Sequence, residues 1–184
     1  MIISRCGGVL ALASLLAALL ISLPLTAGAA AGGGAATPSP YLGYDANKEF
    51  QGGLKALDAG RYHDAKQKFE HVLAVLPGQP TVLFKLGQTD AALGLLRDAA
   101  RAYQDSLYAD PRQIMAAREL AIADLKLGRY DAALAQLQNL RQRAEACGVS
   151  CPEAVDLQGA VHDVEAALSS AGGAAARASK TGAS

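Results

Sequence analysis

Residues 60–94 read GRYHDAKQKFEHVLAVLPGQPTVLFKLGQTDAALG, and residues 94–128 read GLLRDAARAYQDSLYADPRQIMAARELAIADLKLG. Glycine marks each join at intervals of 34 residues. Other positions keep this spacing, and they form columns of small residues, of large apolar residues and of prolines: Gly60, Gly94 and Gly128; Ala65, Ala99 and Ala133; Phe69, Tyr103 and Leu137; Gly53, Gly87 and Ala121; Pro77 and Pro111. A period of 34 residues predicts helix-turn-helix repeats.

The first unit shows how this pattern produces two helices. Residues 47–59 carry apolar side chains at helical spacing, and Gly60 ends that helix. Residues 62–76 form a second apolar face, which Pro77 stops. The absence of a side chain at Gly53 allows the two helices to approach closely.

The repeats are expected at residues 46–79, 80–113 and 114–147. In the third repeat Glu145 stands where a closing proline is expected, so its second helix should continue toward Ala146.

A seventh helix is expected after the repeats, because a solenoid exposes an apolar flank at its end unless a cap covers it. Ser150 and Glu153 have the spacing of a capping box, and Pro152 suits a first helical turn. We assign residues 148–169 to this capping helix. Residues 170–184 lack apolar periodicity and are expected to be a disordered tail.

Short motifs recur within the units: Leu86-Gly87 and Leu120-Ala121 in the first helix, Gly60-Arg61-Tyr62 and Gly128-Arg129-Tyr130 at the turn, and Ala65/Phe69 and Ala99/Tyr103 in the second helix. These motifs resemble the tetratricopeptide repeat (TPR) family over about residues 46–147. The early tryptophan of that family is replaced by Glu49, Leu83 and Ala117. The resemblance implies an all-α fold, a short α-solenoid of three TPR helix-turn-helix repeats plus a C-terminal capping helix.

Residues 1–31 are typical of a secretory signal peptide. Arg5 supplies a positive charge, residues 9–23 are apolar, and small residues follow Pro24. We expect cleavage here and a Gly/Pro-rich linker over residues 32–45. The protein would then be exported to a bacterial periplasm.

An uncleaved inner-membrane anchor is the alternative for this segment. The apolar stretch from Cys6 to Leu25 nearly reaches the roughly 20 residues that a spanning helix needs. Contact with a membrane is expected only through this segment, and only if it is retained.

The composition excludes several classes of protein. A length of 184 residues excludes a large multidomain enzyme, and 51% hydrophobic residues exclude a wholly disordered chain. Because 17 Lys plus Arg balance 17 Asp plus Glu, the chain lacks the basic excess of a nucleic-acid binder.

Cys147 and Cys151 flank the turn before the capping helix. In an oxidising compartment they are expected to form a disulfide. A redox-active thiol pair is a rival reading, although the spacing is C-x3-C rather than C-x-x-C. A zinc site would need more ligands, and His162 and Glu153 do not complete a set, so we expect no metal.

No residue pattern predicts catalysis. His63, His71 and His162 are too far apart in register to act together, and no serine elbow, phosphate loop or carboxylate pair is present. We therefore expect no enzymatic activity and no cofactor.

Binding of another protein is the remaining function. The TPR resemblance implies that the first helices of the repeats line a concave groove. By register, the groove would present Asn47, Phe50, Leu54, Asp58, Thr81, Phe84, Gln88, Met115, Arg118, Ile122 and Lys126. Five of these eleven residues are apolar and three are charged, and this mixture favours an extended or helical apolar segment of a protein or peptide partner.

Two alternatives apply to these groove positions. Some of the residues could belong to the intramolecular core, and residues 41–44 could fill the groove of the first repeat. The expected function is a non-catalytic scaffold or adaptor in the bacterial cell envelope.

Overall fold

The computed structural model describes the backbone of residues 44–181 and the side chains of residues 44–171. The expected signal peptide, and all of the linker before Tyr44, lie outside the described residues. The described part contains seven helices and no strand: α1 (Ala46–Asp58), α2 (Tyr62–Val75), α3 (Pro80–Ala92), α4 (Leu96–Ala109), α5 (Ile114–Lys126), α6 (Tyr130–Cys147) and α7 (Ala154–Thr181). The predicted all-α solenoid is confirmed.

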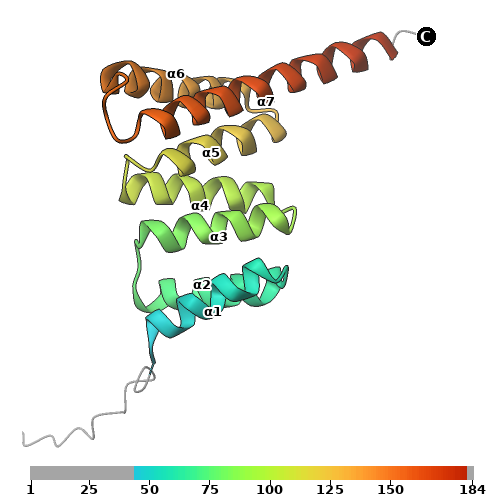
Figure 1. Ribbon diagram of the computed structural model, residues 1–184. Coiled ribbons are helices and arrows are strands. Elements are labelled where there is room, and N and C mark those ends of the chain that lie inside the picture. Colours follow the sequence, from blue (N-terminus) through green and yellow to red (C-terminus); the bar gives the residue numbers. More distant parts are fainter. Residues whose placement is uncertain (1–43, 182–184) are drawn as a thin grey trace, which may run out of the picture. The chain divides into compact units, whose positions relative to one another are not determined.

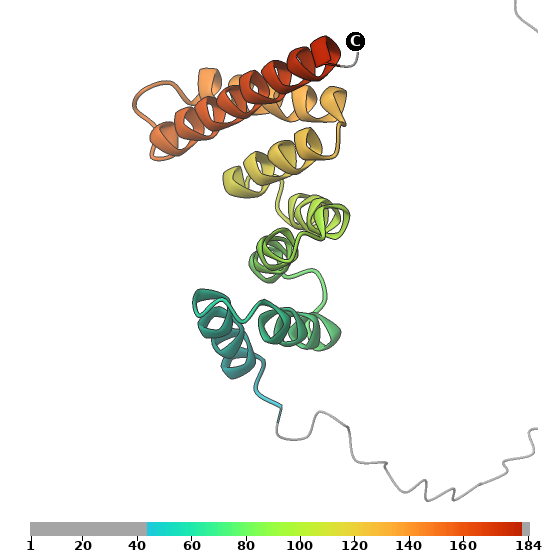
Figure 2. The ribbon, with the colours of Figure 1, turned by 90° about the vertical axis from the view of Figure 1, so that its right-hand side faces the viewer.

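The helix pairs follow one another in chain order, with α1 and α2 side by side at one end and α6 and α7 side by side at the other (Figures 1 and 2). Helices α1 and α2, α3 and α4, and α5 and α6 form the three pairs, and each pair also contacts the next through α2 with α3 and α4 with α5. Helix α7 packs against both α5 and α6. None of the described helices is both long and apolar enough to cross a bilayer.

The turn glycine between the two helices of each pair has a left-handed backbone conformation. Gly60, Gly94 and Gly128 have φ of 71°, 77° and 74°, which is the left-handed region that favours glycine. No atom lies within 4 Å of the position that a β-carbon would take there, so backbone conformation and not lack of space selects glycine.

A second glycine column has the opposite cause. A β-carbon on Gly53 would lie 2.6 Å from Cε1 of Phe69, and one on Gly87 would lie 2.5 Å from Cε1 of Tyr103. Each aromatic ring therefore packs directly on the backbone of the facing helix. The third repeat has alanine and the smaller leucine at these two positions, and both are buried in one core cluster.

Helix α7 covers the apolar flank of the last repeat. Leu157 and Val164 of α7 are buried together with Ala117 of α5 and with Leu137 and Leu140 of α6. Every one of these side chains is at most 3% exposed. Without α7 this layer would face water, which is the reason that a repeat array needs a terminal helix.

The ends of α7 differ from expectation. Helix α7 begins at Ala154, and its first intrahelical hydrogen bond runs from Leu157 N to the carbonyl of Glu153 at 2.9 Å. Glu153 is therefore the N-cap residue, and Ser150 does not cap the first turn. Residues 151–153 form a turn closed by a 3.2 Å bond from Ala154 N to Cys151 O.

The far end of α7 lies at Thr181, well past residue 169, so the helix extends into the segment expected to be a disordered tail. Alanine dominates residues 171–178, and its high intrinsic helix propensity favours continuation of a helix that the core has already nucleated. The expectation of a disordered tail relied on apolar periodicity, which reports burial and not helicity.

Candidate binding surface

The predicted concave residues lie on the first helix of each pair, in α1, α3 and α5. None of the eleven is buried. Asn47, Asp58, Thr81, Met115 and Lys126 are exposed, and Phe50, Leu54, Phe84, Gln88, Arg118 and Ile122 are partly buried. The surface that they form is therefore accessible along the three repeats.

Two phenyl rings of this surface are backed by the core. The ring centroid of Phe50 lies 5.8 Å from that of Phe69, and the centroid of Phe84 lies 5.8 Å from that of Tyr103. Such tilted ring pairs are favourable arrangements. The two partly exposed rings thus stand at equivalent places in consecutive repeats and are held by buried rings beneath them.

Arg118 is occupied by the protein itself. Its Nη1 donates to Oδ2 of Asp163 in α7 at 2.9 Å, and its Nη2 donates to Oε1 of Glu119 at 2.6 Å. Burial lowers the pKa of Arg118, but the hydrogen bonds and negative charges of Glu119 and Asp163 outweigh it, so the pKa is raised. Arg118 therefore attaches α7 to α5 and is not a free group for a ligand.

Tyr44, just before α1, packs on the second helix of its own repeat. Tyr44 is the one described residue of the segment 41–44, and its ring lies 4.7 Å from the imidazole of His71 in α2. Beside it, Lys68 Nζ donates to Glu49 Oε1 at 3.0 Å.

Two buried aspartates were not identified from the sequence. Asp90 and Asp124 are 2% and 3% exposed and stand 34 residues apart in α3 and α5. Lys66 donates to Asp90 at 2.7 Å, and this hydrogen bond is the main reason that the pKa of Lys66 is raised. Burial raises the pKa of Asp124, and its ion pair with Arg129 opposes that rise. Asp90 and Asp124 occupy the same position in consecutive repeats, and this shared position was the signal in the sequence that could have identified them.

The cysteines and histidines are not among the predicted concave residues. The structure joins Cys147 and Cys151 in a disulfide, with a Cα–Cα distance of 5.5 Å. His63, His71 and His162 are exposed. In the described part of the chain, no three His, Cys, Asp or Glu residues come together as metal ligands.

The disulfide closes a short loop between α6 and α7. Replacing both cysteines, Cys147→Ser with Cys151→Ser, should lower the free energy of unfolding by about 2 kcal/mol, because the unfolded chain regains the freedom of that loop. Urea denaturation of the parent and the variant, each with and without reductant, measures this loss. Reductant should affect the parent alone, and two thiols that alkylate freely in the unreduced parent would contradict the disulfide.

Comparison with solved structures identifies the fold. No family model matches the chain, and no curated protein matches it. The TPR domain of Sgt2 from Aspergillus fumigatus is similar in structure, with a TM-score of 0.55, 20% identity, and coverage of 74% of this chain and 84% of that domain. The TPR2B domain of yeast Sti1, solved in a pHsp70 complex, has a TM-score of 0.55, 16% identity, and coverage of 65% and 95% respectively. The described chain is thus an all-α TPR solenoid.

Proposed function

We propose that this chain is a non-catalytic protein-interaction adaptor that binds a peptide or protein segment on its concave surface. The observation that carries the proposal is the pair of partly buried rings, Phe50 and Phe84, each backed by a buried ring. Aromatic side chains that are already held in place lose little entropy on binding and are typical anchors of protein interfaces.

The ligand that suits this surface is an apolar segment. Besides the two rings, the apolar residues of the predicted concave set are Leu54, Met115 and Ile122, and the one arginine among the eleven is engaged by Glu119 and Asp163. An extended or helical segment can place apolar side chains along such a row. The Sti1 domain in its pHsp70 complex supports a protein partner, because its fold is similar.

We further propose that the adaptor acts in the bacterial cell envelope. The signal-like pattern of residues 1–31 supports export, and a disulfide such as that of Cys147 and Cys151 persists in oxidising compartments. Retention of residues 1–25 as an inner-membrane anchor is the alternative. Mass spectrometry of the mature N-terminus distinguishes the two, since cleavage leaves a chain that begins near residue 32.

Replacing both concave rings, Phe50→Ala with Phe84→Ala, should reduce partner recovery at least about tenfold, because both anchors are lost. Crosslinking in the cell followed by purification of the tagged protein measures this. Tyr108→Ala is the matched control, because Tyr108 is an aromatic residue of α4 that is 92% exposed and lies outside the concave set.

Circular dichroism should show that the double variant remains helical, so that lost binding is not lost folding. If the same partners are recovered with the double variant, the concave surface is not where they bind.

A further inference from the structure

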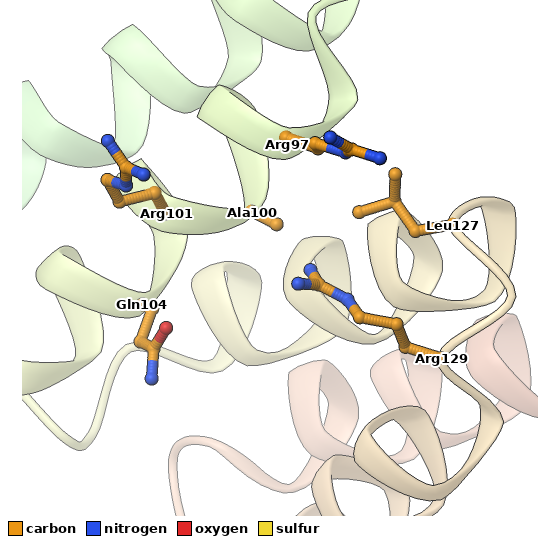
Figure 3. A pocket seen from close by; sticks show the side chains of 6 residues that line it. All are labelled: Arg97, Ala100, Arg101, Gln104, Leu127 and Arg129. Carbon is orange, nitrogen blue, oxygen red and sulfur yellow. The ribbon is translucent and has the colours of Figure 1, made fainter.

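A cavity of about 480 Å³ lies between the second and third repeats (Figure 3). Helix α4 and the α5–α6 turn line it, through Arg97, Ala100, Arg101, Gln104, Leu127 and Arg129. None of the eleven concave residues contributes to it. Its volume is within the range of small-molecule sites, and its charged lining is entirely basic.

The repeat register explains why this space is open. Between the first and second repeats, Lys66 of α2 reaches Asp90 of α3 at 2.7 Å. One repeat later, Asp124 corresponds to Asp90, but Ala100 stands where Lys66 would be. The lysine side chain that spans the first boundary therefore has no counterpart at the second.

Arg129 neutralises the second aspartate instead. It precedes α6 at the position that Leu95 takes in the repeat before, and it forms an ion pair with Asp124. A guanidinium has five N–H donors, and one carboxylate engages only part of them. In Figure 3 the side chain of Arg129 reaches across the cavity toward Ala100.

Arg97 brings a second guanidinium to the same space. It lies beside Leu127 in Figure 3, and it is exposed and forms no ion pair within the described chain. Gln104 adds an amide at the opposite side. Arg101 turns away from Arg129 in that view.

Three acidic residues line neighbouring cavities, and in the described chain none of them forms an ion pair with Arg97. Asp124 is already paired with Arg129, and it lines an adjoining cavity that shares Gln104 and Arg129 with this one. Asp98 and Asp105 line a third cavity together with Arg101, and Asp98 also lines a cavity with Arg97 and Leu127. The cavity beside Ala100 thus keeps the charge of Arg97 and the free donors of Arg129.

We propose that this cavity binds a small organic anion through its carboxylate or phosphate groups, with Arg97 and Arg129 as the principal ligands. The planar guanidinium matches the two oxygens of such a group in a bidentate manner. This site is separate from the concave surface, so an adaptor could bind its protein partner and the anion together.

Titration of the purified full-length protein with citrate, pyrophosphate or sucrose, followed by NMR, tests the proposal. We expect citrate, pyrophosphate or both to shift resonances of α4 and the α5–α6 turn, and sucrose to shift none. Binding of citrate alone identifies a carboxylate ligand, and binding of pyrophosphate alone identifies a phosphate ligand. If neither anion shifts these resonances, the proposal is wrong.

Arg97→Gln should weaken anion binding about tenfold, because one charge-assisted contact is lost. Arg112→Gln is the matched control, since the side chain of Arg112 is 85% exposed and does not line the cavity. Equal loss in both variants would mean that the anion responds to general surface charge, and it would overturn the site.

A second variant tests the cavity while retaining a partner for Asp124. Ala100→Lys with Arg129→Leu copies the first repeat boundary, where a lysine at this position pairs with the buried aspartate. The variant should fold and should lose anion binding at least about tenfold. Undiminished binding in this folded variant would also overturn the site.

Discussion

Replacing Tyr103 by alanine should lower the free energy of unfolding by about 3–5 kcal/mol. Tyr103 is 1% exposed and heads the fully buried side chains of the described structure by volume. Its ring packs on the backbone at Gly87 and beside Phe84, so alanine would leave a cavity that two rigid helices cannot close. Urea denaturation followed by circular dichroism measures the loss. Tyr108→Ala, at a residue that is 92% exposed, should change stability by less than about 0.5 kcal/mol.

The same crossing offers a test of its geometry. Gly87→Ala alone should cost about 1–3 kcal/mol, because the new β-carbon would lie 2.5 Å from the Tyr103 ring. Gly87→Ala with Tyr103→Leu copies the third repeat, where Ala121 and Leu137 occupy these positions. The double variant should be more stable than the sum of the two single changes by about 1 kcal/mol. Strict additivity would mean that the two positions do not contact each other.

The arrangement of the helices could be predicted from the sequence because its causes are local or periodic. A glycine such as Gly94 follows the first helix of a repeat because the backbone there has a positive φ, and that requirement recurs in each repeat. The contact of Gly87 with Tyr103 couples a small residue on one helix to a large one on the next, and it also recurs. Repetition makes such pairs visible in one sequence.

Contacts that occur once could not be predicted in this way. Arg118 was placed on the concave surface by register, but Asp163, 45 residues later, lies beside it only because α7 packs on α5. The start of α7 differs from the predicted capping box for a related reason. Residues between the disulfide and Ala154 form a turn, so the local pattern of Ser150 and Glu153 does not become a capping box.

The concave residues were predicted from register alone, and their exposure now divides them into exposed and partly buried residues. Phe50 and Phe84 are partly core and partly surface, which a sequence pattern cannot resolve because both roles require an apolar residue. The basic cavity was missed for a different reason. The cavity is open because Ala100 stands at the repeat position that Lys66 takes one repeat earlier. An alanine does not by itself indicate a binding site, so the cavity becomes apparent only in the structure.

Replacing Arg129 by leucine should destabilise the protein by about 3 kcal/mol at neutral pH, because the buried carboxylate of Asp124 loses its counter-ion. Leucine is the residue that the second repeat has at this position, as Leu95, so its size and shape suit the turn. Adding Ala100→Lys should restore most of the loss, since Lys66 pairs with Asp90 in the same way at the first boundary.

The loss in Arg129→Leu should depend on pH in a defined direction. Burial raises the pKa of Asp124, and without Arg129 nothing opposes that rise. A carboxyl with a higher pKa in the folded state binds its proton more tightly when folded, so stability falls as pH rises from the unfolded value of about 4 through the folded pKa. The variant should therefore approach the parent in acid and diverge from it toward neutral pH. Asp124→Asn in the Arg129→Leu background removes the titrating group and should abolish the divergence; a loss that is the same at every pH would show that packing, and not the buried charge, is the function of Arg129 in the fold.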